Sequence, residues 1–208
     1  MASTSQLKES LRPPVYDLLA GHYDRAMQPL ERFVFARLRP HLFRDLPPDA
    51  RLLEIGAGTG ANFQFYPATA TGAACELSRE MIEIGRAKQK PCGISFVQCE
   101  AERLPFADHS FDVAIASLVF CSVASQPEAF AELRRVVRPR GTIRLLEHVR
   151  PRGILGYVFD ALNLITVPLF DDHFNRRTAR EAFRAGLRIE RIERRALGIV
   201  NLISCRVP

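Results

Sequence analysis

Residues 52–60 constrain this chain most, because the apolar run Leu-Leu-Glu-Ile ends there in three alternating glycines. Glycine tolerates a positive φ and lets a ligand approach where a Cβ would clash. The pattern therefore predicts a strand over residues 51–55, a ligand-binding turn, and a helix from Gly60 to Tyr66 that ends before Pro67. Glu54, two residues before the first glycine, would repel a pyrophosphate and suits a cationic or amine-bearing ligand.

A second acid follows the next expected strand. Residues 71–75 are predicted as that strand, and Glu76 comes directly after it, 16 residues beyond Gly60. At a strand tip this far from a glycine turn, a carboxylate can accept both ribose hydroxyls of an adenosyl group. The alternative is a helix cap or a solvated acid. We expect Glu76 and its neighbour Leu77 to contact a cofactor.

Strands and helices are expected to alternate beyond this point. Such alternation predicts an α/β fold with a doubly wound, mostly parallel seven-stranded sheet. Ser78 is expected to cap a helix whose inward residues are Met81, Ile82 and Ala87. The expected strands are 94–98, 113–116 and 142–146, the helices are 79–88, 127–137 and 174–184, and an antiparallel hairpin of 187–195 and 199–206 closes the sheet.

The first 46 residues are expected to form a helical cap. Residues 15–46 show apolar spacings of three and four, which predict two helices with a break near residues 21–23. The expected apolar stripe includes Leu30, Phe33, Val34, Leu38 and Leu42.

Several of these stretches together resemble one family. The glycine turn with Glu54, the segment Glu100-Ala101-Glu102-Arg103-Leu104-Pro105-Phe106, and the repeated Tyr16-Asp17 and Tyr23-Asp24 are similar to motifs of the class I S-adenosylmethionine (SAM) methyltransferases. The resemblance implies a Rossmann-like fold, SAM as the cofactor, S-adenosylhomocysteine as the product and no metal. It implies cofactor contacts by Tyr23, Glu54, Gly56, Ala57, Gly58, Gly60, Asn62, Glu76, Leu77, Glu100, Ala101, Glu102, Ser117 and Leu118.

The turn after the fourth expected strand bears on the methyl acceptor. Methyltransferases of nucleic-acid bases carry Asn/Asp-Pro-Pro-Tyr/Phe there, and residues 117–123 lack it. Residues 60–67, 118–123 and 147–149 instead resemble the methyltransferase-like alkyl thiol S-methyltransferases and their bacterial relatives. This implies a small apolar acceptor, with a thiol first. A lipid head group or a quinone is the alternative acceptor. A SAM-binding protein without catalytic activity is the alternative from a different functional class.

A thiol acceptor is mostly protonated at neutral pH, so a general base would raise its thiolate fraction. The candidate catalytic residues are His148, Asp172 and His173; a loop-orienting role for His148 and solvated loop positions for the other two are the alternatives. Cys121 is interpreted as an apolar helix residue rather than a nucleophile.

Residues 154–170 are the most apolar segment, but polar residues interrupt it and it is shorter than the roughly 20 residues of a membrane span. It is expected to cover the substrate, with a core helix as the alternative, and it or the N-terminal helices could touch a membrane surface. We expect one domain over residues 1–208, with a cap (1–46), a SAM-binding core (47–150), the cover (151–175) and a last helix with the hairpin (176–208).

Composition bears on the possible partners. The net charge is +6, and residues 171–208 hold nine arginines against five acids. No stacking aromatics accompany them, which favours a solvated face over a nucleic-acid site. The five cysteines lack metal-ligand spacing and the first ten residues are polar, so a cytoplasmic protein with a small-molecule substrate is expected. No pattern indicates an oligomeric state.

Overall fold

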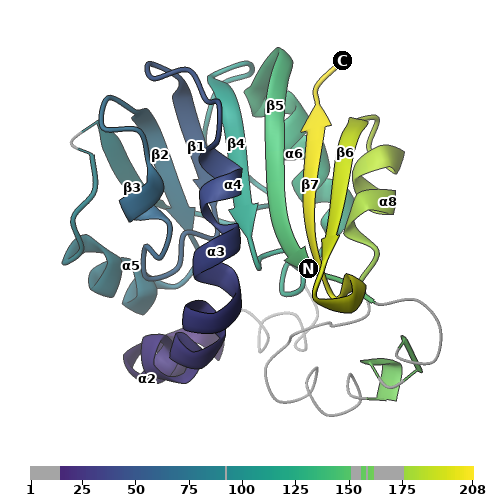
Figure 1. Cartoon of the computed structure of the whole chain (residues 1–208). Coiled ribbons are helices and arrows are strands. Elements are labelled where there is room, and N and C mark those ends of the chain that lie inside the picture. The colour runs from purple at the N-terminus through teal and green to yellow at the C-terminus, as the bar shows by residue number, and fades with distance from the viewer. Residues whose placement is uncertain (1–14, 92, 151–155, 158, 162–175) are drawn as a thin grey trace, which may run out of the picture.

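A computed structural model describes residues 15–91, 93–150, 156–157, 159–161 and 176–208. Its centre is a seven-stranded sheet in the order β3-β2-β1-β4-β5-β7-β6 (Figure 1). The first five strands pair in parallel, and β7 runs antiparallel between β5 and β6. The predicted doubly wound α/β fold is confirmed. The strands are β1 (Arg51–Ile55), β2 (Thr71–Glu76), β3 (Ile94–Gln98), β4 (Phe111–Ser117), β5 (Val137–His148), β6 (Arg188–Arg195) and β7 (Val200–Arg206).

Each face of the sheet has its own apolar core because side chains alternate along every strand. Leu53 and Ile55 of β1 belong to a core that includes Phe130 and Ala182, from the helices α6 and α8. Leu52 belongs to the opposite core, with Leu42 of α4. The helices beside the sheet are α3 (Ala36–Leu38), α4 (Pro40–Phe43), α5 (Arg79–Arg86), α6 (Gln126–Val136) and α8 (Thr178–Arg184).

The N-terminal cap begins with α2 (Val15–Leu30), which lies below the carboxyl ends of the parallel strands in Figure 1. The predicted break near residues 21–23 is wrong, since α2 runs through them. The irregularity comes after Pro29, where a π-helix spans Glu31–Phe35. Proline lacks the N–H that would continue the α-helical hydrogen bonds, which places the change of helix type at this point.

The π-helix also changes which cap residues face inward. Its wider turn shifts the apolar face by about one residue relative to an α-helix. Phe33 is 69% exposed and Leu30 is 49% exposed, whereas Phe35 is buried. The predicted apolar stripe is therefore wrong for Leu30 and Phe33 and right for Leu42.

The helix predicted from Gly60 to Tyr66 is wrong. Only one 3-10 turn, η2 (Phe63–Phe65), follows the glycine turn. Gly60 has a φ of +79° and lies against the Phe63 ring, so the chain cannot enter an α-helix at this glycine. The helices α3 and α4 cover the sheet here instead, and the rings of Phe43 and Tyr66 lie 5.4 Å apart.

The other helix and strand boundaries differ less from their predicted positions. Met81 and Ile82 are buried as expected, but Ala87 is exposed because α5 ends one residue before it. The strand β5 begins at Val137, which pairs with Phe111, and so starts before the predicted residue 142. Residues 174–175 of the predicted last helix, and most of the predicted cover over residues 151–175, lie outside the described residues. No helix in the described ranges is long and apolar enough to cross a bilayer.

Candidate functional site

The three glycines after β1 all adopt left-handed backbone conformations, with φ values of +60° at Gly56, +54° at Gly58 and +79° at Gly60. A Cβ on Gly56 would lie 2.4 Å from a methyl carbon of Val119. A Cβ on Gly58 would meet nothing within 4 Å. Gly56 is therefore required by packing as well as by backbone conformation, whereas Gly58 borders open space.

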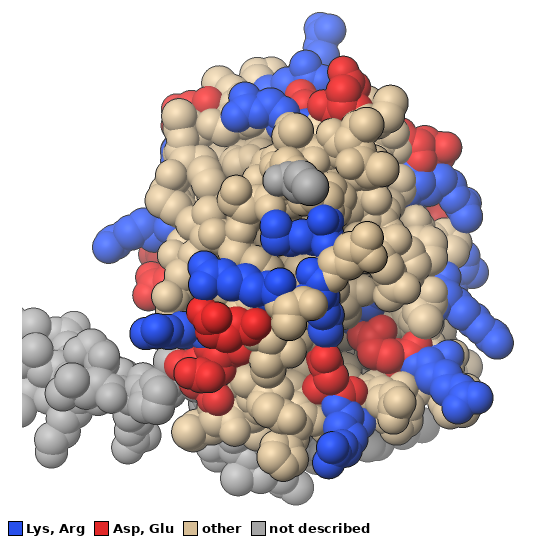
Figure 2. Space-filling model, turned by 90° about the vertical axis from the view of Figure 1, so that its left-hand side faces the viewer, with Lys and Arg blue, Asp and Glu red and all other residues tan. Residues whose placement is uncertain are grey.

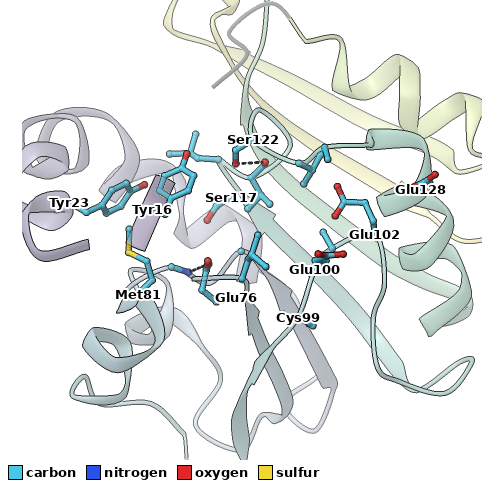
Figure 3. Close-up of a pocket in the computed structure, with 18 residues that line it drawn as sticks. Tyr16, Tyr23, Glu76, Met81, Cys99, Glu100, Glu102, Ser117, Ser122 and Glu128 are labelled. Atoms are coloured by element: carbon cyan, nitrogen blue, oxygen red, sulfur yellow. Dashed lines mark hydrogen bonds between the residues drawn. The ribbon is translucent and has the colours of Figure 1, made fainter. Parts of the chain in front are cut away.

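That space is a cavity of about 420 Å³ at the carboxyl ends of the parallel strands. It lies where β1 has β2 on one side and β4 on the other, the switch point at which doubly wound sheets bind ligands. Figure 3 shows Tyr16 and Tyr23 on one side and Glu100, Glu102 and Glu128 on the other. The lining residues are Tyr16, Tyr23, Gly56, Gly58, Glu76, Leu77, Met81, Cys99, Glu100, Ala101, Glu102, Ser117, Leu118, Val119, Ser122, Val123, Ala124 and Glu128.

Glu76 joins the glycine turn to the start of α5. Its Oε2 accepts a hydrogen bond from the Gly58 N–H at 2.8 Å, and its Oε1 accepts one from the Ser78 N–H at 2.9 Å. Burial raises the pKa of Glu76, and these backbone N–H groups offset part of that rise. Each carboxylate oxygen has lone pairs left, so Glu76 can also accept hydroxyl donors from a ligand.

The helix α2 is anchored to this site by two aspartates. Asp17 accepts hydrogen bonds from the hydroxyl of Ser78 and, at 3.4 Å, from the Glu80 N–H. One heptad later, Asp24 accepts from the Thr59 hydroxyl at 2.5 Å and the Lys88 ammonium at 2.7 Å. These bonds place Tyr16 and Tyr23 against the cavity.

The turn after β4 forms another wall of the cavity. Leu118 has a φ of +59°, a conformation that costs a non-glycine residue energy and persists only when its surroundings impose it. The Leu118 N–H donates to the Leu146 carbonyl at 2.8 Å. Oε1 of the fully buried Glu147 accepts from the N–H groups of Val119 and Phe120 at 3.1 and 3.3 Å. The end of β5 thus holds this turn in place.

A buried polar cluster lies behind the glycine turn. Asn62 donates through Nδ2 to Oε1 of Glu54 at 2.5 Å and to Oγ of Ser117 at 2.8 Å. The Tyr66 hydroxyl donates to the other oxygen of Glu54. Burial raises the pKa of Glu54 to about 6, although the bonds from Tyr66 and Asn62 and the charge of Arg39 act in the opposite direction.

The walls of the cavity are acidic. Glu76, Glu100, Glu102 and Glu128 line it, and the described lining residues include no lysine or arginine. Glu102 also accepts from the Ser125 N–H at 3.0 Å, which holds its carboxylate in the wall. Such a lining suits a ligand that carries positive charge.

A thiol also lines the cavity. Cys99 is half-buried, and a hydrogen bond with Cys75 lowers its pKa while the pKa of Cys75 is raised well above the usual range.

In the described ranges, no group of His, Cys, Asp and Glu side chains could hold a metal ion.

The structure separates the predicted cofactor residues into two groups. Ten of them line the cavity: Tyr23, Gly56, Gly58, Glu76, Leu77, Glu100, Ala101, Glu102, Ser117 and Leu118. Glu54 and Asn62 are buried behind the turn, Ala57 and Gly60 are buried within it, and none of the four lines the cavity.

His148, the predicted catalytic residue that falls within the described ranges, is not among the residues that line the cavity. His148 is the last residue of β5, half-buried and paired with Val200 of β7. Asp172 and His173 lie outside the described residues.

Three contributions were missed by the sequence interpretation. Asp17 and Asp24 anchor α2, and the repeated Tyr-Asp pair seven residues apart could have indicated this, since such residues share one helix face. Arg39 is 6% exposed and belongs to the buried cluster, which only the folded arrangement shows. Glu147 was noted as part of a motif but given no role.

A mostly parallel seven-stranded sheet with flanking helices is the Rossmann-like architecture that the chain shares with solved SAM-dependent methyltransferases. Residues 53–145 match the family model described as "Methyltransferase domain". This part of the chain is therefore similar to a methyltransferase domain, and the proteins that the chain resembles include SAM-dependent methyltransferases.

Among these relatives, thiol S-methyltransferase TMT1B of Homo sapiens is 32% identical over 163 residues, which cover 74% of this chain and 64% of that protein. The ubiquinone/menaquinone biosynthesis C-methyltransferase UbiE of Azotobacter vinelandii is 31% identical over 128 residues, or 57% of this chain and 51% of that protein. The matched region thus spans less than two thirds of either relative. A solved SAM-dependent methyltransferase of Thermotoga maritima shares the fold, with a TM-score of 0.72, 20% identity, and coverage of 93% of this chain and 99% of that one.

Proposed function

We propose that this protein is a SAM-dependent methyltransferase that methylates a small, apolar acceptor, with a thiol as the first candidate. The observation that carries the proposal is the convergence of Gly58, Glu76 and Ala101 on one cavity at the switch point of the sheet. A glycine turn that borders open space, a strand-tip carboxylate and an alanine of the following loop suit an adenosyl cofactor at this place.

Each wall has a separate part in binding. Glu76 accepts the ribose hydroxyls, Glu100 and Ala101 contact the adenine, and Tyr23 covers the methionine part. Bound SAM supplies a methyl group on a positively charged sulfur. The protein aligns the acceptor with that methyl group and excludes water, while the acidic walls favour the positive charge.

The acceptor assignment rests on the wall after β4 and on the relatives. Leu118, Val119, Val123 and Ala124 give this side of the cavity an apolar surface. The relatives include a thiol S-methyltransferase and a ubiquinone/menaquinone biosynthesis C-methyltransferase. A thiol therefore comes first and a quinone second; a lipid head group remains the further alternative.

A nucleic-acid site is not favoured on the face beside β3 and α5. Figure 2 shows that basic and acidic side chains are interspersed on the face beside β3 and α5, without a basic surface free of acids. A nucleic acid binds to continuous positive charge, because each phosphate contact needs a cation.

The general base is proposed to be His148, Asp172 or His173. His148 is adjacent to Glu147, which holds the turn that lines the cavity. A base at this end of β5 would act on an acceptor seated against that turn.

The test is methyl transfer from labelled SAM to a panel of alkyl thiols, phenols, quinols and lipid amines. The proposal predicts turnover with at least one apolar thiol and formation of S-adenosylhomocysteine in equal amount. Binding of SAM without turnover on any acceptor would favour the non-catalytic alternative. Failure to bind SAM would refute the proposal.

His148→Ala separates catalysis from binding. We expect its kcat on a thiol to fall roughly 10- to 100-fold at pH 7 and to recover as pH rises toward the pKa of the thiol, with the Kd for SAM unchanged. His22→Ala is the control, because His22 is an exposed residue of α2. Unchanged kcat at neutral pH would remove His148 as the base and leave Asp172 and His173.

A further inference from the structure

Arg39 lies between α3 and α4 of the cap and is directed into the domain. Its side chain is 7% exposed. Its Nη1 donates to Oδ1 of Asn62 at 2.9 Å and to Oγ of Ser117 at 2.8 Å, and its Nε donates to Oε2 of Glu31 at 3.0 Å. A cap residue thus reaches the end of β4, 78 positions away in sequence.

These bonds determine the orientation of the Asn62 amide. A guanidinium can only donate, so the atom of Asn62 that faces Arg39 has to be the oxygen. The amide nitrogen then faces Glu54 and Ser117, to which it donates at 2.5 and 2.8 Å. Arg39 and the Glu54 carboxylate therefore select the same amide orientation from opposite sides.

The hydroxyl of Ser117 is constrained in turn. Its oxygen accepts one hydrogen bond from Arg39 and one from Asn62, which uses both of its lone pairs. Its own proton is left to donate, and within the described ranges no residue accepts it. Ser117 lines the cavity, so the cavity is where an acceptor can be. Ser122, on the same wall, differs because its hydroxyl already donates to the Val119 carbonyl at 3.1 Å.

We propose that Arg39 is a positioning residue that, with Asn62, makes the Ser117 hydroxyl a hydrogen-bond donor into the cavity, and that its acceptor is the carboxylate of bound SAM. This inference rests on the proposed function. A hydroxyl that accepts from a guanidinium is a stronger donor, and the strongest acceptor for it is an anion. The carboxylate is the one anionic group of SAM, and it would otherwise enter a cavity lined by four glutamates.

The carboxylate is also the group that most needs this donor. Glu76, Glu100, Glu102 and Glu128 favour the sulfonium and the amine of SAM but repel its carboxylate. A neutral donor backed by a buried cation can offset that repulsion without placing a positive charge beside the sulfonium. Arg39 keeps its own charge balanced by Glu31, which lies outside the cavity lining.

The test compares SAM with decarboxylated SAM, which keeps the adenosine, the sulfonium and the amine but lacks the carboxylate. Isothermal titration gives the ratio of the two dissociation constants for each variant. We expect the wild-type protein to bind SAM about 10- to 100-fold more tightly than decarboxylated SAM, the range for one hydrogen bond to a charged group. Ser117→Ala and Arg39→Gln should each bring the ratio close to one, because each weakens the binding of SAM but not that of decarboxylated SAM.

Further variants distinguish positioning from folding. Arg39→Lys keeps a cationic donor but cannot reach Asn62, Ser117 and Glu31 together, so we expect an intermediate ratio. Combining Ser117→Ala with Arg39→Gln should change the ratio no further than Ser117→Ala does, because both act through the same hydroxyl. Arg37→Gln, an exposed arginine of α3, is the matched control and should keep the wild-type ratio.

The outcomes separate the claims. A ratio unaffected by Ser117→Ala overturns the carboxylate assignment. A ratio lowered by Ser117→Ala but kept by Arg39→Gln and Arg39→Lys overturns the role of Arg39, and equal weakening of both ligands shows a purely structural role. If Arg39→Gln does not fold, Arg39→Lys still tests the role of Arg39 and Ser117→Ala still tests the carboxylate assignment. Failure of the wild-type protein to bind either ligand refutes the proposed function instead.

Discussion

Glu54 is a carboxylic acid with almost no access to water, since the residue is 1% exposed. Burial penalises its ionised form more than Tyr66, Asn62 and Arg39 favour it, and its pKa is raised to about 6. The folded protein therefore holds the Glu54 proton more tightly than the unfolded chain does. The stability that this contributes is complete below the unfolded pKa of 4.5 and is lost as pH rises through about 6.

Glu54→Gln should remove this pH dependence, because glutamine can still accept from Asn62 and still meets the Tyr66 hydroxyl. We expect the difference in unfolding free energy, wild type minus variant, to fall by about 2 kcal/mol between pH 4 and pH 7. Urea denaturation at several pH values measures it, and the other titrating groups cancel in the difference. A difference that is flat or rises with pH would contradict the raised pKa.

At the scale of an element, α2 is a separate helix held over the site by a small number of polar bonds. Asp24 binds Thr59 of the glycine turn and Lys88 beyond α5, and Asp17 binds Ser78 at the start of α5. Burial would raise the pKa of Asp24, but the bonds from Lys88 and Thr59 and the charge of Lys88 lower it overall. The carboxylate of Asp24 thus stays ionised and bound to both partners at neutral pH.

Asp24→Ala should loosen α2 with little effect on global stability. The Lys88 and Asp24 side chains are 38% and 50% exposed, so loss of their ion pair should cost under about 1 kcal/mol. We expect faster amide hydrogen exchange over residues 15–30 and a roughly 3- to 10-fold faster dissociation of SAM, measured by stopped-flow fluorescence or surface plasmon resonance. Asp49→Ala, in an exposed turn, is the control. Unchanged exchange in α2 would show that the apolar contacts alone hold it.

The whole domain should be stabilised by its cofactor, because a ligand that binds only the folded state raises the free energy of unfolding. At a SAM or S-adenosylhomocysteine concentration of 100 Kd the gain is about 2.7 kcal/mol, which for a chain of this size raises the Tm by about 5 to 11 °C. Glu76→Ala should lose most of this shift, since the ribose hydroxyls lose their acceptor.

Scanning calorimetry with and without ligand measures both effects and separates them. Glu76→Ala also lowers the Tm without ligand, because it removes the bonds to Gly58 and Ser78. Glu80→Ala, which replaces an exposed acid in the first turn of α5, should show the full ligand shift. A full shift in Glu76→Ala would refute the ribose contact.

Local patterns account for much of the architecture. Apolar runs ending in turn residues located all seven strands, and Ser78 was recognised as a cap that accepts from the Met81 N–H at 3.2 Å. Glu76 was predicted from its position after a strand and Ala101 from the family resemblance of residues 100–106, and both line the cavity. These features depend on neighbours in sequence, so their physical causes can be seen without the fold.

Long-range packing decided the rest. The burial of Phe35 and the left-handed conformation of Leu118 depend on packing and hydrogen bonds supplied by distant segments. Glu54 is bonded to Asn62 and Tyr66 behind the turn, and Arg39 of the cap reaches Ser117 at the end of β4.

The sequence by itself determined the sheet, the glycine turn and the acids at the strand tips, because apolar periodicity and glycine conformations act over a few residues. Only the tertiary structure decided which of those acids face the cavity and which lie behind it. It also decided that the Ser117 hydroxyl accepts from Arg39 and Asn62 and keeps its proton for a further hydrogen bond. Those outcomes depend on burial and on hydrogen-bond partners that meet only when the chain has folded.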